Sequence, residues 1–200
     1  MKEMRVVLPS IERPKKLPVV LSRNEVRQLL KAPKLLKHRL VLAMLYGCGL
    51  RSFELCNLQL KDLDLERMML HIRQGKGRKD RYVPLCAMQV RGLRKYISAE
   101  RPVTWCFNGN DSKGDPVALS TTGVQWIVRE ARKHSGIQKE VTTHSLRHSY
   151  ATHLLEMGLD IISVKDLLGH ADIQTTLTYL HVAQLGRQRP FSPLERLYNK

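Results

Sequence analysis

The sequence predicts a mixed α+β domain that is mostly α-helical and contains one small antiparallel β-sheet. Helix-capping motifs and apolar positions at helical spacing recur along most of the chain. Strand-like alternation is found instead at 68–73 and 81–85, on either side of a glycine-containing turn. With 200 residues and 42% hydrophobic content, the chain can bury one core of ordinary size.

The first two helices are delimited by a capping box and a proline. Ser22 and Glu25 have the spacing at which a serine hydroxyl and a glutamate carboxylate satisfy free N–H groups at a helix start. This helix extends to about Lys31, and Pro33 separates it from a second helix at about 35–46. The later part of the second helix is almost entirely apolar, so we expect this helix to be central.

A Gly-Cys-Gly break at 47–49 ends that helix, and another helix begins at Arg51. The two strand-like segments are joined by QGKGRKD, whose two glycines permit a tight turn. We therefore predict a β-hairpin with a basic tip at 67–86. Later helices are expected at about 87–99, 121–135, 144–157, 160–168, 172–183 and 193–199, with a turn-rich segment at 108–116.

The charge balance points to a polyanionic partner. The chain has 34 Lys and Arg against 18 Asp and Glu, a net charge of +16. Nucleic acid is the commonest polyanion bound by such a domain, although a ribosome-like surface or a need for solubility would give the same charge. Four scattered cysteines without a C-x-x-C pair favour reduced thiols. We find no secretory leader and no apolar run of spanning length, so we expect a cytoplasmic protein with no membrane partner.

Six positions have side chains suited to phosphate chemistry, although each alone also has a structural explanation. They are Arg51, Lys76, His144, Arg147, His170 and Tyr179. A lone Arg51 most often pairs with a carboxylate, here Glu54 at i+3. A basic hairpin tip is by itself most often a solvated loop. His144 and His148 have the i, i+4 spacing of a metal pair, but the H-E-x-x-H pattern and a third ligand are missing, so we expect no metal.

Together, the six positions occur in a specific order. The motifs are G-L-R at 49–51, G-K-G at 75–77, H-S-L-R at 144–147, L-G-H at 168–170 and a tyrosine nine residues later. The flanking sequences R-x-x-E-L, K-D-R-x-V-P-L and H-A-D-I-Q-T-T belong to the same pattern. This pattern resembles the catalytic signature of the tyrosine recombinase (phage integrase) family. The resemblance covers about 20–185 and implies the fold of the DNA breaking-rejoining enzymes.

The resemblance implies that DNA is cleaved and rejoined through a covalent 3′-phosphotyrosine, with no metal or ATP as cofactor. Tyr179 would be the nucleophile, and Lys76 would protonate the leaving 5′-oxygen. The phosphate would be held by Arg51, His144, Arg147 and His170, with Glu54 orienting Arg51. Further DNA contacts are assigned to Arg78, Lys79 and Arg81. Tyr150 is the nearest alternative nucleophile, although its place among leucines indicates a core residue.

The resemblance also implies a division of the chain. We expect a basic, proline-containing arm or interdomain linker at 1–20, a catalytic domain at 21–185 and a tail with a short helix at 186–200. The family's N-terminal DNA-clamping domain is expected to be absent, which leaves open a catalytic fragment or a naturally short member.

Double-stranded DNA is the expected partner, with a homo-oligomer, a synaptic tetramer, assembling on it. The short C-terminal helix would pack on its own domain or on a neighbouring protomer. Two other functions remain open: a type IB topoisomerase-like relaxing enzyme, and a DNA-binding protein or regulator without catalysis.

Overall fold

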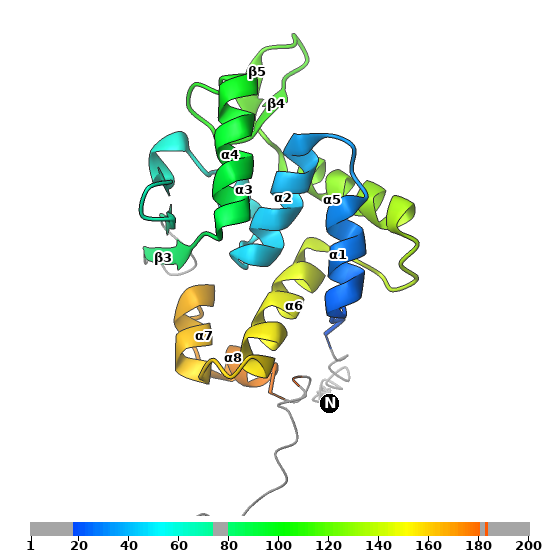
Figure 1. Cartoon of the computed structure of the whole chain (residues 1–200), viewed down its shortest axis with the longest axis vertical. Coiled ribbons are helices and arrows are strands. Elements are labelled where there is room, and N and C mark those ends of the chain that lie inside the picture. The colour runs from blue at the N-terminus through cyan, green and yellow to red at the C-terminus, as the bar shows by residue number, and fades with distance from the viewer. Residues whose placement is uncertain (1–17, 74–79, 181–182, 184–200) are drawn as a thin grey trace, which may run out of the picture.

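The computed structural model describes residues 18–73, 80–180 and 183. Most of this part of the chain is helical, and the strands form two small antiparallel sheets (Figure 1). The α-helices are α1 (Arg23–Lys31), α2 (Leu36–Gly47), α3 (Ser52–Cys56), α4 (Ala87–Glu100), α5 (Thr121–Ser135), α6 (Thr143–Glu156), α7 (Ile161–Leu168) and α8 (Gln174–Leu177). A 3-10 turn, η1, covers Leu60–Asp62. The predicted fold class, mostly helical with a small antiparallel sheet, is confirmed.

The first sheet has the order β1-β2-β3, with β1 at Leu63–Asp64, β2 at Met69–Ile72 and β3 at Arg81–Pro84. Strands β2 and β3 form the predicted hairpin, in which Leu70 pairs with Val83. Leu70 and Val83 are both fully buried, as expected for the inward positions of alternating strands. Strand β1 was not predicted, because two residues are too few to produce a recognisable alternation.

Two other segments differ from the prediction. The turn-rich segment at 108–116 contains a second hairpin, formed by β4 (Asn108–Asn110) and β5 (Pro116–Ala118). The predicted helix at 172–183 is reduced to α8, and a turn at 178–180 follows it. Three threonines in this segment favour a short helix, since β-branched side chains lose rotamer freedom in helices. The predicted helix at 193–199 lies outside the described residues.

The buried apolar side chains form two separate clusters. The large core is formed by side chains of α1 to α5, the first sheet and the beginning of α6, from Leu21 to Leu146. The small lobe is formed by the later part of α6, by α7 and by the segment around α8, which lie together at the lower end of Figure 1. Its buried members are Tyr150, Ala151, Leu155, Val164, Leu168 and Tyr179.

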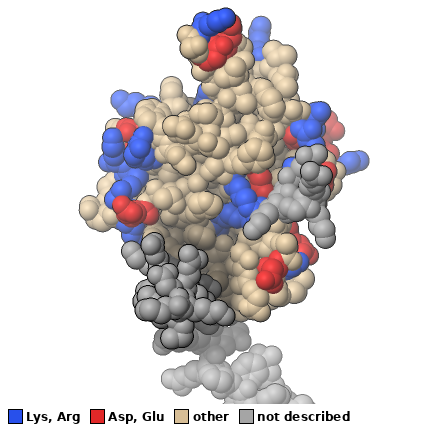
Figure 2. All heavy atoms as spheres, turned by 180° about the vertical axis from the view of Figure 1, so that it is seen from behind, with Lys and Arg blue, Asp and Glu red and all other residues tan. Residues whose placement is uncertain are grey.

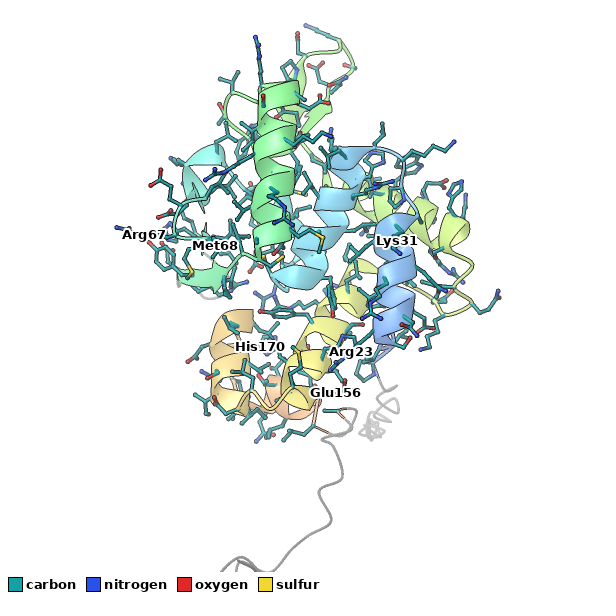
Figure 3. The ribbon with its side chains drawn as sticks, in the orientation of Figure 1. Arg23, Lys31, Arg67, Met68, Glu156 and His170 are labelled. Atoms are coloured by element: carbon teal, nitrogen blue, oxygen red, sulfur yellow. The ribbon has the colours of Figure 1, made fainter. Side chains whose placement is uncertain are left out.

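Helix α6 has buried side chains in both clusters, and the segment at the start of α1 contacts it. The backbone N–H of Leu21 donates to Ser149 Oγ at 2.9 Å, and Arg23 faces Glu156 at 3.8 Å (Figure 3). The start of α1 and the residues just before it are therefore joined to α6 by two polar contacts. Every helix in the described ranges is too short or too polar to cross a lipid bilayer.

Candidate active site

The site begins at the tight turn that precedes α3. Gly49 has φ +58°, and a Cβ at this position would lie 2.5 Å from Cδ1 of Tyr150. Both the backbone conformation and the close contact therefore require glycine. The turn directs the Gly49 carbonyl toward Arg147, whose Nη1 donates to it at 2.5 Å. It also places Arg51 at the N-cap position of α3, in extended conformation.

Glu54, on the first turn of α3, is a buried carboxylate shared by three arginines. It accepts from Arg51 Nη1 at 2.9 Å and from both Nη atoms of Arg81 at 2.9 and 2.8 Å. Arg147 Nη1 lies 3.9 Å from the same carboxylate. Burial alone would raise the pKa of Glu54, but the hydrogen bonds and charge of Arg81, followed by Arg51 and Arg147, hold this pKa below its ordinary value.

The same three arginines also bind the C-terminal end of α7. Arg81 Nε donates to the carbonyl of Leu167 at 2.9 Å, and Arg147 Nη2 donates to that of Leu168 at 2.6 Å. Arg51 Nη2 lies 3.4 Å from the Gly169 carbonyl. Carbonyls at a helix C-terminus lack intrahelical partners and carry partial negative charge, so guanidinium groups stabilise them. These contacts attach the small lobe to the large core.

The resulting cluster has more positive than negative charge, since one carboxylate faces three guanidinium groups. Lys and Arg atoms reach the surface between the upper body and the lower lobe (Figure 2). Burial, followed by the neighbouring Arg51, lowers the pKa of Arg147 to about 10, so this side chain is still charged at neutral pH. An anion placed here would relieve the repulsion between the arginines.

The first turn of α6 contributes His144 and Arg147 on one face. Thr142 caps the helix by accepting from the N–H of Ser145 at 3.1 Å. His144 is exposed, whereas Arg147 is 3% exposed and bound on both sides by main-chain carbonyls. The i, i+3 spacing therefore places one exposed imidazole and one fixed guanidinium at the same helix end.

His170 enters the site immediately after α7. The helix ends at Gly169 in left-handed conformation, with φ +62°. The next residue, His170, bonds through Nδ1 to Thr176 Oγ1 at 2.9 Å and lies within the small lobe (Figure 3). Burial, followed by the charges of Arg147 and Arg51, lowers the pKa of His170 to about 3. This imidazole is neutral at physiological pH.

Tyr179 lies in the turn after α8 and is 3% exposed. Its ring is stacked near the ring of His170, with 6.2 Å between centroids. Its hydroxyl is 3.0 Å from Nδ1 of His148, a residue that sequence reasoning had placed outside the phosphate cradle. Burial raises the pKa of Tyr179, while Arg147 and Arg51 oppose that rise. The only sequence signal for His148 was its i, i+4 spacing from His144.

Among the sequence-predicted residues, five meet at the junction of the two clusters: Arg51, Glu54, Arg147, His170 and Tyr179. His144 lies beside them on α6, with its ring 6.3 Å from that of His148. Lys76, Arg78 and Lys79 fall outside the described residues. Tyr150 packs against Gly49 in the small lobe, and burial raises its pKa to about 12.

Arg81, which the sequence analysis assigned to the DNA contacts, lies in an internal ion pair. Its side chain is 8% exposed, and its donors are taken by Glu54 and the Leu167 carbonyl. The strand alternation of β3 turns Arg81 inward while Tyr82 points outward. Arg81 therefore makes an internal contact with Glu54, and its assignment as a DNA contact stays a prediction.

The candidate metal pair, His144 and His148, has no suitable third ligand among the described side chains. In the ranges 18–73 and 80–180, no group of three or more His, Cys, Asp or Glu side chains is arranged to hold a metal ion. His148 bonds to Tyr179 through Nδ1, which favours a role toward the phenol.

Comparisons with known proteins agree with this geometry. The model of the phage integrase family matches residues 19–185. The tyrosine recombinase XerA of Thermococcus onnurineus is 40% identical over 171 residues, which are 84% of this chain and 60% of the relative. This chain therefore spans less than two thirds of that relative's length.

Two solved structures have the same fold. A crystal structure of XerA recombinase superimposes with a TM-score of 0.79 at 32% identity, covering 92% of this chain and 68% of that one. The XerH site-specific recombinase, bound to a palindromic difH substrate in a post-cleavage complex, gives a TM-score of 0.71 at 28% identity. That match covers 84% of this chain and 51% of XerH.

Proposed function

Because this chain belongs to the phage integrase family, the tyrosine recombinases, we propose that it is a site-specific DNA strand transferase. It cleaves and rejoins double-stranded DNA through a covalent 3′-phosphotyrosine at Tyr179. The observation that carries this proposal is the convergence of two arginines and a histidine on one buried tyrosine. Arg51, Arg147 and His170 come from α3, α6 and the end of α7, and all lie near Tyr179.

The arginines and histidines of the site are proposed to bind a single DNA phosphate. The planar, forked donors of Arg51 and Arg147 suit a charge shared by two non-bridging oxygens. His144 and His170 complete the cradle and stabilise the additional negative charge of the pentacoordinate transition state. Each such preorganised donor is typically worth about 10²- to 10³-fold in rate.

In the cleavage step, Tyr179 Oη forms a bond to phosphorus and the bond from phosphorus to the 5′-oxygen breaks. The phenol loses its proton, and the leaving 5′-oxygen gains one from Lys76, which we assign as the general acid. Lys76 lies outside the described residues, in the segment that joins β2 to β3. Rejoining is the reverse reaction, so the phosphodiester bond energy is kept and neither ATP nor a metal ion is needed.

The remaining residues are given supporting roles. Arg78 and Lys79, in the same segment as Lys76, are proposed to contact the DNA backbone. Glu54 holds Arg51 in position, and Arg81 holds Glu54. A synaptic tetramer on two DNA sites is the proposed assembly, and the XerH complex with difH supports duplex DNA as the substrate.

A covalent-adduct assay tests this function and identifies the target site in the same experiment. A duplex library with a randomised centre and a nick that releases a short 5′-hydroxyl fragment traps cleaved product on the protein. We expect an SDS-resistant protein–DNA adduct in EDTA and without ATP, from which sequencing gives the preferred site. Tyr179→Phe should abolish the adduct, whereas Tyr150→Phe should retain it.

Three outcomes would contradict the proposal: no adduct with the wild type, an adduct that persists in Tyr179→Phe, or dependence on a divalent metal. Joint molecules between two labelled duplexes carrying the selected site would separate strand exchange from simple relaxation. A chain that relaxes supercoiled plasmid but yields no joint molecules would be a topoisomerase-like enzyme.

A further inference from the structure

We propose that His148 is the catalytic base that takes the proton from Tyr179 when this tyrosine attacks the DNA phosphate. The inference rests on the proposed function and adds to it a residue outside the phosphate cradle. The reaction requires a proton acceptor, because a phenol with an ordinary pKa of about 10 is almost entirely protonated at neutral pH. Burial raises the pKa of Tyr179 further, so attack by a preformed phenolate is disfavoured.

The geometry places a nitrogen directly on the reacting hydroxyl. His148 Nδ1 is 3.0 Å from Tyr179 Oη, within hydrogen-bond distance of the proton that must leave. The two ring centroids are 5.5 Å apart and the ring planes are inclined at 51°, so the rings are tilted rather than stacked. With its hydrogen on Nε2, neutral His148 accepts the phenol O–H through Nδ1.

The surroundings keep His148 in the form that can accept a proton. Burial, followed by the neighbouring His144 and Arg147 on the same helix, lowers the pKa of His148. From the segment after α7, Tyr179 and His170 face it. These neighbours are cationic, neutral or titratable, and none of them is a carboxylate that would hold an imidazolium in place. His148 is therefore a free base at neutral pH.

The proton transfer is balanced by the phosphate. As Oη bonds to phosphorus, the Oη–H bond breaks and its electron pair stays on oxygen, while the proton goes to His148 Nδ1. The imidazolium that forms is repelled by Arg147 but attracted by the negative charge growing on the phosphorane. In rejoining, the 5′-hydroxyl attacks, Tyr179 leaves, and His148 returns the proton. Loss of His148 should therefore slow cleavage and rejoining alike.

A second histidine–tyrosine pair on the same helix provides an internal control. His153 Nδ1 is 2.9 Å from Tyr46 Oη, and the centroids of the two rings are 5.8 Å apart. This pair joins α6 to α2, and neither residue belongs to the site described above. Because the two pairs share a helix and a bond type, a purely structural role for His148 predicts equal effects of the two histidine substitutions.

The test uses single-turnover cleavage of the nicked duplex selected with the wild-type chain. His148→Asn keeps an acceptor near the Nδ1 position but cannot take a proton, so we expect cleavage about 10²-fold slower. The acid side of the pH–rate profile should flatten in this variant. His148→Ala should regain rate on addition of free imidazole, whereas His153→Asn should cleave within about threefold of the wild type. DNA affinity and the melting temperature check that each variant is folded and binds.

Two results would overturn the assignment while leaving the proposed function in place: His148→Asn cleaving within about threefold of the wild type with the same pH profile, or equal losses in the His148 and His153 variants. If His148→Ala does not fold, the Asn variant still decides. Failure of the proposed function is visible separately, because in that case the wild-type chain forms no adduct at all.

Discussion

The large core and the small lobe carry different parts of the same site. The large core fixes Glu54 and the start of α6, and its buried side chains come from many helices and the first sheet. Among the described residues, the small lobe has six buried apolar side chains, and Tyr179 is one of them. Since stability follows buried apolar area, three of the proposed phosphate ligands, Arg51, His144 and Arg147, rest on the more stable region. The proposed nucleophile, Tyr179, rests on the less stable region together with His170.

This difference suggests how a buried tyrosine can act on DNA. The phosphate ligands must be fixed before the substrate arrives, because preorganised charge is what stabilises the transition state. In the proposed reaction, Tyr179 must reach the phosphorus of one DNA strand and later release it. A small lobe attached by polar contacts permits this movement. The arginine contacts to the end of α7 are the points at which the two regions can be separated.

The largest expected effect is from Glu54→Gln, which removes the carboxylate shared by both regions. Removing one partner of a buried ion pair typically costs about 3–5 kcal/mol, because the other charge is left uncompensated. Three arginines would then repel one another, so both urea stability and adduct formation should decrease. Glu130→Gln, which removes an exposed pair with Lys133, is the control and should leave both unchanged. Equal effects of the two substitutions would contradict the central role of Glu54.

Gly49→Ala should have the next largest effect, since it displaces a contact between the regions. The added Cβ would meet the ring of Tyr150 at 2.5 Å, in a backbone conformation with φ +58°. Strain and overpacking together should cost about 2–4 kcal/mol in urea unfolding. Gly136→Ala is the matched control, because Gly136 also has positive φ, at +74°, but nothing lies within 4 Å of its Cβ. A control as destabilised as the Gly49 variant would show that contact with Tyr150 is unimportant.

Acid should loosen the small lobe before the large core. Burial and the nearby arginines lower the pKa of His170 to about 3 in the folded chain. In the unfolded chain this imidazole has its ordinary pKa of about 6.5, so it binds a proton at pH values where the folded chain does not. The unfolded state therefore gains protons as pH falls, and stability decreases by about 1.5 kcal/mol from about pH 6.5 to about pH 5. Hydrogen exchange at pH 5 should show α7 amides losing protection before those of α2. His170→Gln should weaken this dependence, whereas replacement of the exposed His134 should preserve it.

The smallest effect is expected from the helix caps. Asp160 caps α7 by accepting from the N–H groups of Ile162 and Ser163, both at 2.9 Å, and Ser120 caps α5 by accepting from Gly123 at 3.0 Å. Asp160→Ala should open α7 locally and raise its hydrogen-exchange rate several-fold. Ser120→Ala should leave α5 protected, because the large core holds that helix. Equal local opening in both helices would contradict the difference between the two regions.

Local sequence patterns predicted secondary-structure elements well where the deciding residues lie close together in the chain. The capping box of Ser22 and Glu25 forms as expected, and α1 extends to Lys31 as predicted. The predicted helix at 160–168 ends at Gly169, where the glycine adopts the left-handed conformation. These features depend on residues three or four positions apart, so the sequence contains the information directly.

The features that the sequence did not reveal depend on pairing between separate segments. Strand β1 is a strand because Leu63 pairs with Leu70, and β4 is a strand because Asn108 pairs with Ala118. Neither segment has enough alternation to be recognised alone. Arg81 was assigned to the basic hairpin by its neighbours in sequence, whereas its partner is Glu54, on α3.

The sequence by itself determined the family and the order of its motifs, because the residue types and their spacing can be read directly from it. It also determined most helices, through local caps and breakers. The tertiary structure alone decided that three arginines share Glu54 and the end of α7, and that His148 meets the hydroxyl of Tyr179 across 31 positions. The reason is physical: such contacts depend on how α3, α6 and α7 pack, and packing is set by the summed burial of both clusters.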